Sequence, residues 1–246
     1  CHIITIEDPV EFSFKDRKSI ITQREVGLDT GGFTKALKYA LRQDPDVILV
    51  GEMRDEETMR MAIAAAETGH LVLSTLHTLD ATETINRIVG SMEGSLHDQV
   101  RHQLAATLNG VVSQRLIRKK DGNGRIPALE ILVNNVRIKE MIRDPSLTQD
   151  IRRAIEESRH NGMQTFDQSL MELYQKDLIT EEEALLHCSN IQDFQLRLGG
   201  VVPGQWDQKS EEVTKSRRQR IAEALKEKGK DNDKIEIDLS DSKKAS

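Results

Sequence analysis

The chain has 246 residues, a formal net charge of −6 at pH 7, 37% hydrophobic residues and 3% aromatic residues. This length suits one large domain or two smaller ones, with a core built mainly from aliphatic side chains. The acidic balance argues against a general nucleic-acid binder, which usually presents a dominant basic face. No apolar run approaches the roughly 20 residues that a membrane-spanning helix needs, so any membrane contact is expected to be peripheral.

The two cysteines, Cys1 and Cys188, have no partner at the spacing of a metal site. Their isolation favours a reducing, cytoplasmic setting without a zinc site. The chain begins with Cys1 rather than Met and passes at once into an apolar run. We therefore expect a fragment of a longer protein, with sequence missing upstream.

Three short apolar runs in the first third of the chain predict β-strands. They lack clean polar alternation, which is typical of strands buried on both faces of a parallel sheet. The runs are Ile3–Ile6, Val47–Val50 and Leu71–Thr75.

Two helices are expected between these strands. Phe33–Arg42 is predicted as a helix that stops before Pro45, because the residue before a proline is disfavoured in the helical region. Asp55–Thr68 has apolar residues at helical spacing. Asp55 is a suitable N-cap and Gly69 can end this helix. The alternation of strands and helices predicts an open α/β sheet.

Two more helices, a hairpin and a helical bundle are predicted downstream. The helices cover Ala81–Ser91 and Leu96–Asn109. An Asp-Gly-Asn-Gly turn joins the predicted strands Val111–Ile117 and Ile126–Val133. The pattern then changes to a helical bundle over Val136–Leu198.

Within the bundle, Thr165 and Thr180 are predicted to open helices as capping boxes. Residues 201–246 are densely charged with few apolar side chains, and we expect a mostly disordered tail there, with a helix around Glu211–Glu227. A partner-binding helix over Val213–Leu225 is the alternative for part of this tail.

The three predicted strands lead into chemically active side chains: Glu7, Glu52 and His77. In open α/β sheets, ligands bind at the carboxyl ends of the strands. Phosphoryl transfer needs a carboxylate at this place, to hold Mg²⁺ through water or to orient the attacking water. A single acidic residue can simply end a strand, but three matched strand ends favour a shared site.

At this point the residues resemble motifs of the secretion ATPase superfamily, in the order that the family has them. TIEDPVEF at Thr5–Phe12 resembles its Asp box, DVILVGEMRD at Asp46–Asp55 its Walker B motif, and TGHLVLSTLHT at Thr68–Thr78 its His box. QREVGLDT at Gln23–Thr30 and ALRQDPD at Ala40–Asp46 resemble the PilT/PilU branch of type IV pilus retraction ATPases.

The resemblance runs from His2 to about Gly200. It implies an α/β fold: a RecA-like P-loop NTPase core with a mostly parallel sheet and helices on both faces, truncated at its N-terminus. We expect this core in residues 1–134, a C-terminal helical subdomain in residues 135–200, and the charged tail in residues 201–246.

The resemblance also implies roles for the residues at the strand ends. Glu52 matches the Walker B catalytic glutamate that acts on the attacking water, and Glu7, with Asp8, matches the Asp-box carboxylate. Both glutamates would act on Mg²⁺ through water. His77, with His70, matches the His box that senses the γ-phosphate or contacts a neighbouring subunit. Asp8 could instead be a turn or N-cap residue, and His70 a structural histidine.

Arg54 and Arg24 are further candidates for binding the nucleotide. They could pair with Glu52 and Glu7, or reach across an interface between subunits. An ordinary salt bridge is the alternative for Arg54.

One departure from the family pattern bears on activity. No G-x-x-x-x-G-K-[ST] string occurs in the sequence, although a phosphate-binding loop needs one. The family places this loop shortly upstream of the Asp box and carries a PAS-like domain before it. We therefore expect this chain alone to bind ATP poorly and not to hydrolyse it.

The segment after Ser113 separates branches of the family. Extension and type II secretion ATPases carry a four-cysteine zinc knuckle there, whereas this chain has no cysteine in that region, which favours retraction. VRIKEMIRD at Val136–Asp144 resembles a motif associated with retraction, although it is divergent. Its alternative is an ordinary amphipathic helix with Ile138, Met141 and Ile142 inward. PilT-like and PilU-like members are not separated.

The resemblance as a whole implies an ATP-hydrolysing hexameric motor subunit that powers type IV pilus retraction and twitching motility at the cytoplasmic face of the inner membrane. ATP and Mg²⁺ would be its cofactors. A homo-hexamer, the inner-membrane pilus platform protein and a paralogous retraction ATPase would be its partners, with no nucleic acid and no zinc. Alternatives are a non-catalytic accessory ring subunit, a secretion or pilus-assembly ATPase, and a DNA-translocating conjugation ATPase.

Overall fold

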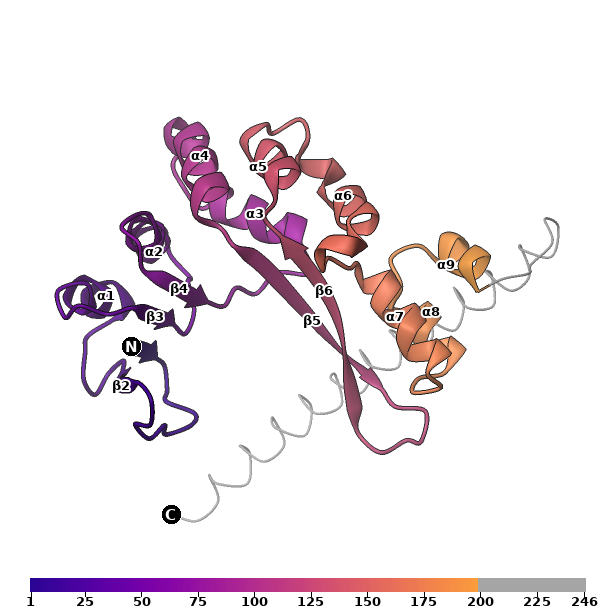
Figure 1. Ribbon diagram of the computed structural model, residues 1–246, viewed down its shortest axis with the longest axis horizontal. Helices are drawn as coiled ribbons and strands as arrows, with labels where there is room; N and C mark the ends of the chain where they lie inside the picture. The colour runs from indigo at the N-terminus through magenta and orange to yellow at the C-terminus, as the bar shows by residue number, and fades with distance from the viewer. Residues whose placement is uncertain (199–246) are drawn as a thin grey trace, which may run out of the picture. The chain divides into compact units, whose positions relative to one another are not determined.

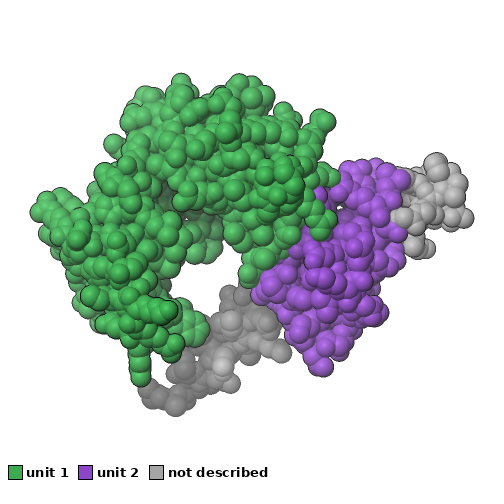
Figure 2. Space-filling model, viewed as in Figure 1, with its two compact units in different colours: residues 1–114, 129–165 green, residues 115–128, 166–246 purple. Residues whose placement is uncertain are grey.

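A computed structural model describes residues 1–198 of the chain. The chain forms two compact units, shown in Figure 2. The first unit comprises Cys1–Gln114 and Leu129–Thr165, and the second comprises Arg115–Ala128 and, among the described residues, 166–198. The domain boundaries expected near residues 134 and 200 stay predictions. The predicted tail, with its helix around Glu211–Glu227 or over Val213–Leu225, lies outside the described residues.

A four-stranded parallel sheet forms one end of the first unit (Figure 1). Its strands are β1 His2–Glu7, β2 Ile20–Glu25, β3 Val47–Val50 and β4 Leu71–Ser74, in the order β2-β1-β3-β4. The three strands predicted from apolar runs are confirmed. β2 was not predicted, because its sequence IITQRE mixes apolar and polar residues and lies at the edge of the sheet.

The core of the sheet lies on one face. Ile6, Ile48 and Val50 are fully buried there, against the predicted helices α1 Phe33–Ala40 and α2 Glu56–Glu67. The register sets this arrangement, since Ile6 lies opposite Val50 in the parallel pair β1–β3 and side chains alternate between faces.

The prediction that the Leu71 strand is buried on both faces is wrong for the described residues. Leu71 is 45% exposed and Leu73 is 47% exposed. Helices α1 and α2 pack against the opposite face, where Val72 joins their cluster. An apolar run therefore shows that a strand is part of a sheet, but not that both of its faces are covered within the described chain.

The remaining helices of the first unit share a second core. They are α3 Ala81–Gly90, α4 His97–Thr107, α5 Val136–Arg143 and α6 Ile151–Glu157, with 3-10 turns at Gly94–Leu96, Thr148–Asp150 and Arg159–Asn161. Fully buried side chains from these helices include Ile85, Ala105, Ile138 and Ile155. Met59 of α2 belongs to the same cluster, so α2 connects the sheet to this second core.

A two-stranded hairpin, β5 Gly110–Arg118 and β6 Arg125–Val133, contributes to both units. The second unit adds α7 Phe166–Gln175, α8 Glu181–His187 and α9 Ile191–Arg197. Its core includes Phe166, Phe194 and Ile117. The predicted cap of α8 is confirmed, because the Thr180 side chain accepts a hydrogen bond from the Glu183 N–H at 3.2 Å.

Helix α5 matches the amphipathic alternative for the divergent retraction motif. Ile138, Met141 and Ile142 are its buried residues. Its exposed Arg137 donates to Glu157 of α6 at 2.7 Å. A retraction role for this helix stays a prediction.

The N-cap of α2 supplies a first test. The Asp55 side chain accepts from both the N–H and the hydroxyl of Thr58, each at 2.8 Å. Asp55→Ala should lower the free energy of unfolding by about 1 kcal/mol, the usual cost of losing such a cap, measured by urea denaturation. Asp55→Asn should retain most of the stability, because asparagine also caps well. Equal losses in both variants would contradict this account.

A second test concerns pH. Hydrogen bonds from Arg137 and Arg153 lower the pKa of Glu157 below its ordinary value. Because the folded state favours the ionised form, this link stabilises the fold above the unfolded pKa of the carboxyl and is lost as pH falls through the lower folded pKa. Carboxyl-detected NMR titration should show the Glu157 pKa rising in Arg137→Ala. An unchanged value would show that Arg137 does not act on it.

Candidate active site

The ends of β1 and β3 lie side by side in the sheet. The parallel ladder continues past the strands, with the Gly51 N–H donating to the Ile6 carbonyl at 2.8 Å. A Cβ atom at Gly51 would lie 3.1 Å from Ile6 O and 3.4 Å from the Cα of Glu7. A side chain at this position would therefore be tightly packed against the backbone of β1, where β3 turns toward Glu52. The backbone carrying Glu7 packs directly against the residue before Glu52.

The end of β4 is fixed to the same turn. Thr75 Oγ1 donates to the Gly51 carbonyl at 2.6 Å, and the Met53 N–H donates to the Thr75 carbonyl at 3.3 Å. These bonds position the segment that leads to His77. The three strand ends therefore meet at one edge of the sheet.

Glu52 lies at the centre of a small charged cluster. Its side chain is 13% exposed, whereas those of Arg54 and His77 are 72% and 85% exposed. Arg54 Nε lies 2.7 Å from Glu52 Oε2, and His77 Nε2 lies 3.5 Å from the same oxygen. The carboxylate is thus half-buried, while solvent or a ligand can reach both of the nitrogen groups beside it.

Glu7 is held by a different set of contacts. Its Oε1 atom accepts from Thr5 Oγ1 at 2.6 Å and from Gln23 Nε2 at 3.1 Å. Within residues 1–198, no hydrogen bond or ion pair joins Glu7 to Glu52 or His77. The structure thus places all three residues at one sheet edge, in two separate side-chain clusters.

The other predicted site residues are spread more widely. Asp8 is exposed at the carboxyl end of β1. Arg24 donates to Gln43 Oε1 at 3.3 Å, and no ion pair joins it to Glu7 in the described part of the chain. His70 precedes β4, and its Nδ1 lies 3.0 Å from the Ala65 carbonyl near the end of α2. His70 and His77 therefore flank opposite ends of the same strand.

The family model described as "Type II/IV secretion system protein" matches residues 1–185. The chain belongs to this family.

Three of the curated relatives carry names that refer to type IV pili or to twitching motility. The chain is 49% identical over 183 residues to the "Type IV pilus retractation ATPase PilT" of Pseudomonas aeruginosa, covering 74% of this chain and 53% of that protein. It is 48% identical over 189 residues to a "Twitching motility protein" of Neisseria gonorrhoeae, covering 77% and 50%. It is 44% identical to the "Type IV pilus ATPase PilU" of P. aeruginosa, covering 80% and 51%.

Solved structures agree with the sequence comparisons. A crystal structure described as the "Pilus Retraction Motor PilT and Bound ADP" matches with a TM-score of 0.71 and 48% identity, over 79% of this chain and 55% of that one. The Legionella pneumophila ATPase DotB matches with a TM-score of 0.68 and 27% identity, over 75% and 50%. These matches confirm the predicted α/β fold class and the resemblance to PilT/PilU-like secretion ATPases.

Two further findings apply to this chain. The chain spans about half the length of the curated relatives it matches. Among residues 1–198, no helix is both long and apolar enough to span a membrane.

A metal ion fits this site only in a restricted way. Within the described residues, no group of three or more His, Cys, Asp or Glu side chains is gathered to hold one. Mg²⁺ typically takes one or two carboxylates and completes its shell with water and substrate phosphates. Glu7 and Glu52 fit that water-mediated role, which stays a prediction.

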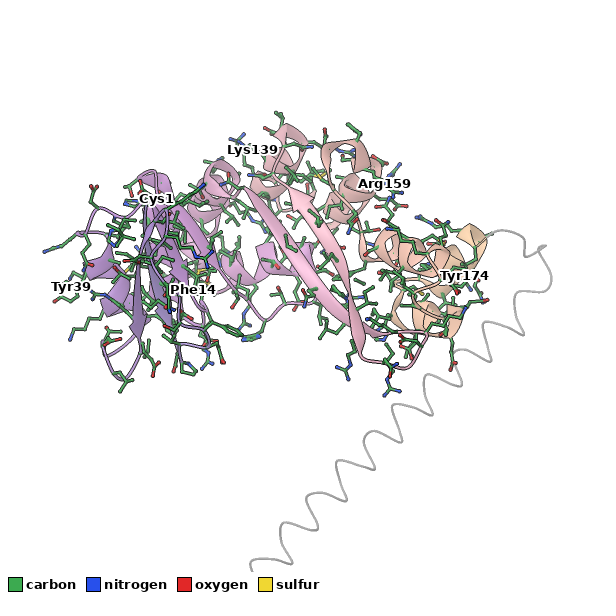
Figure 3. The ribbon with its side chains drawn as sticks, turned by 60° about the horizontal axis from the view of Figure 1, so that its bottom comes forward. Cys1, Phe14, Tyr39, Lys139, Arg159 and Tyr174 are labelled. Atoms are coloured by element: carbon green, nitrogen blue, oxygen red, sulfur yellow. The ribbon has the colours of Figure 1, made fainter. Side chains whose placement is uncertain are left out.

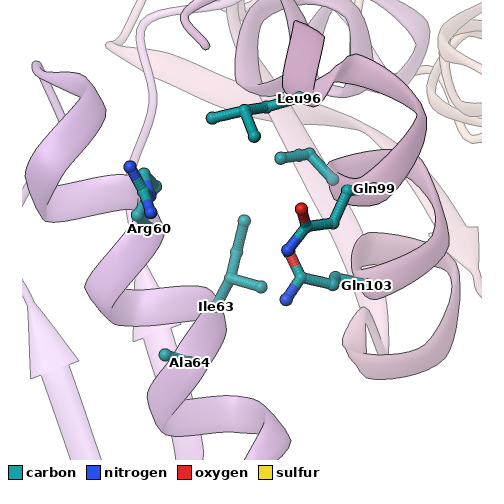
Figure 4. Close-up of a pocket in the computed structure, with 7 residues that line it drawn as sticks. Arg60, Ile63, Ala64, Leu96, Gln99 and Gln103 are labelled. Atoms are coloured by element: carbon teal, nitrogen blue, oxygen red, sulfur yellow. The ribbon is translucent and has the colours of Figure 1, made fainter. Parts of the chain in front are cut away.

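One pocket of the first unit lies away from the candidate site residues. A pocket of about 120 Å³ lies between α2 and α4 (Figure 4). Its lining residues are Arg60, Ile63, Ala64, Leu96, Gln99, Val100 and Gln103. Glu7, Glu52 and His77 do not line this pocket.

The residues that position the acids were not predicted. Thr5 lies two residues before Glu7, so strand alternation places both on one face and could have identified Thr5. Gln23 could not be found in this way, because the strand that carries it was not predicted. Gly51 was read only as part of the Walker B resemblance.

The close approach at Gly51 supplies the test for this site. Gly51→Ala should lower the free energy of unfolding by about 1–3 kcal/mol, because its Cβ would press on backbone atoms of β1. Gly90→Ala is the matched control: nothing lies within 4 Å of that position, and alanine in a helix is favourable. Thermal and urea denaturation measure both. A neutral Gly51→Ala would contradict the packing of the two strand ends.

Proposed function

We propose that this protein is an ATP-hydrolysing motor subunit that powers type IV pilus retraction. The observation that supports this most directly is the position of Glu52, half-sheltered at the end of a central strand and paired with His77 and Arg54. Relatives that are 44–49% identical are named for pilus retraction, pilus ATPase activity and twitching. The neighbouring strand end supplies a second carboxylate, Glu7.

In the proposed reaction, Glu52 orients the attacking water and accepts its proton. The water oxygen forms a bond to the γ-phosphorus while the bond from that phosphorus to the β–γ bridging oxygen breaks, releasing ADP and phosphate. A carboxylate that accepts a proton in the transition state contributes on the order of 10²–10⁴-fold to the rate. The other groups at the site position reactants and compensate charge.

Glu7 and Glu52 would hold Mg²⁺ through water, with Asp8 next to the first of them. A bound Mg²⁺ would supply charge neutralisation on the phosphates. Glu7 is suited to this role because both of its protein donors bind Oε1, which leaves Oε2 able to accept from a coordinated water.

His77 and Arg54 are suited to sensing the nucleotide or a neighbouring subunit. Both side chains are largely exposed while their nitrogen atoms lie near Glu52. A γ-phosphate or a partner's side chain could draw either away from Glu52, which would couple the site to assembly. The local contacts of Arg24 and His70, to Gln43 and Ala65, favour structural roles over direct nucleotide binding.

The motor would act as a homo-hexameric ring on the inner-membrane pilus platform protein, at the cytoplasmic face of the membrane, together with a paralogous retraction ATPase. Ring assembly would bring exposed residues such as His77 to a neighbouring subunit. Force would come from domain movement on ATP turnover.

The catalytic assignment is tested with Glu52→Gln in a protein that joins this chain to an upstream phosphate-binding loop. Glutamine keeps the size of Glu52 but cannot take a proton, so kcat for ATP should fall on the order of 10²–10⁴-fold. Glu57→Gln is the control, because Glu57 is exposed in the first turn of α2. Unchanged turnover in Glu52→Gln would contradict the assignment and favour a non-catalytic ring subunit.

The chain alone provides a companion test. Because it lacks a phosphate-binding loop sequence, residues 1–246 should bind Mg-ATP weakly in calorimetry and show no turnover. Hydrolysis by the isolated chain at the rate of the longer protein would contradict the site proposed here. Stimulation of turnover by DNA would instead favour a DNA-translocating ATPase.

A further inference from the structure

The side-chain amide of Gln23 in β2 makes three hydrogen bonds. Its Nε2 donates to Glu7 Oε1 at 3.1 Å and to the Phe12 carbonyl at 2.9 Å. Its Oε1 accepts from the Phe14 N–H at 2.8 Å. The orientation of the amide is determined by these partners, since a carboxylate and a carbonyl can only accept and an N–H can only donate.

The sheet register explains why Gln23 reaches Glu7. Gln23 lies opposite Thr5 in the parallel pair β1–β2, and Thr5 and Glu7 share a face because side chains alternate along a strand. Two neutral donors therefore converge on one oxygen of Glu7, from Thr5 at 2.6 Å and from Gln23 at 3.1 Å. Such hydrogen bonds to an ionised group are stronger than neutral ones, so they fix the rotamer of the carboxylate.

The same amide holds the loop between β1 and β2. Phe12 is 74% exposed and Phe14 is 56% exposed on this loop. Figure 3 labels Phe14 in the region of the parallel sheet, where Cys1 is also labelled. Exposed aromatic side chains cannot anchor a loop through a core. The loop is held instead by polar contacts with β2, of which Gln23 makes two, while Glu25 Oε2 accepts from the Val10 N–H at 3.1 Å.

We propose that Gln23 is a positioning residue that sets the orientation of the Glu7 carboxylate and couples it to the loop of Phe12 and Phe14. If the loop moves, either the hydrogen bond between Gln23 and Glu7 breaks or the Glu7 carboxylate moves with the loop. The catalytic consequence rests on the proposed ATPase function, whereas the structural coupling does not.

Three substitutions of Gln23 distinguish its contact with Glu7 from its contacts with the loop. Gln23→Leu removes all three hydrogen bonds at similar size. Gln23→Glu keeps an acceptor for the Phe14 N–H but places a carboxylate against Glu7. Gln23→Lys keeps a donor toward Glu7 but offers no acceptor to Phe14.

The contact between Gln23 and the loop is tested by measuring, with NMR, the rate of hydrogen exchange at the Phe14 amide in the protein of residues 1–246. Exchange should accelerate on the order of tenfold, about the effect of losing one hydrogen bond, in Gln23→Leu and Gln23→Lys. It should stay close to the unsubstituted rate in Gln23→Glu. Exchange at Phe14 that is the same in all four proteins would overturn the proposed coupling, whatever the protein's activity.

The contact between Gln23 and Glu7 is tested by steady-state ATPase kinetics in the protein that includes a phosphate-binding loop. Here kcat should fall on the order of tenfold or more in Gln23→Leu, which loses the hydrogen bond to Glu7, and in Gln23→Glu, whose carboxylate repels Glu7. The fall in kcat should be smaller in Gln23→Lys, which still donates to Glu7. KM for ATP should change less than kcat, because Gln23 acts through Glu7. A loss confined to KM would overturn the positioning role.

Gln103→Leu is the matched control. Gln103 Nε2 donates to Glu67 Oε2 at 2.9 Å, so the same substitution removes a glutamine–glutamate bond away from the strand ends. It should leave kcat unchanged. If Gln23→Leu resembled Gln103→Leu while Glu52→Gln was inactive, the inference would be wrong and the ATPase function would stand. If Gln23→Leu does not fold, the comparison of Gln23→Glu with Gln23→Lys gives the same decision.

Discussion

The candidate site depends on one backbone contact, the hydrogen bond from the Gly51 N–H to the Ile6 carbonyl. It extends the parallel pairing of β1 and β3 beyond the last strand residue and brings the chain segments of Glu7 and Glu52 side by side. A Cβ at Gly51 would lie only 3.1 Å from the Ile6 carbonyl oxygen. Through Thr75, the third strand end is joined to the same glycine. The backbone at Gly51 thus fixes the positions of the chain segments that carry the three candidate side chains.

From this shared edge, the two carboxylates are held in contrasting ways. Glu7 is fixed by neutral donors from its own strand and from β2. Glu52 has exposed partners, Arg54 and His77, whose nitrogen atoms are open to solvent or ligand. A fixed carboxylate suits a positioning task, and an exchangeable one suits a group that must respond to nucleotide. This contrast fits a site in which one acid organises the phosphates and the other acts on water.

Much of this arrangement could be predicted from the sequence, for identifiable reasons. The strands of Ile6, Val50 and Leu73 are short apolar runs, and Asp55 is a cap of the expected type. The convergence of Glu7, Glu52 and His77 at one edge follows from parallel strand direction alone. Side-chain pairing does not follow from strand direction, which is why the separation of Glu7 from the Glu52 cluster was not foreseen.

Other features depend on contacts between residues far apart in sequence. β2 pairs with β1 through register rather than through its own hydrophobicity, so both the strand and Gln23 were missed. The exposure of Leu73 depends on which segments cover the sheet, and composition carries no information about that.

The most direct test of the central claim is a structure of this chain joined to an upstream phosphate-binding loop, with a non-hydrolysable ATP analogue and Mg²⁺ bound. The account predicts the γ-phosphate at the common edge of β1, β3 and β4, with Glu52 and Glu7 each within one water molecule of the phosphate or metal. A nucleotide bound elsewhere, such as against α2 and α4 near Arg60, with Glu7 and Glu52 facing only protein, would contradict it.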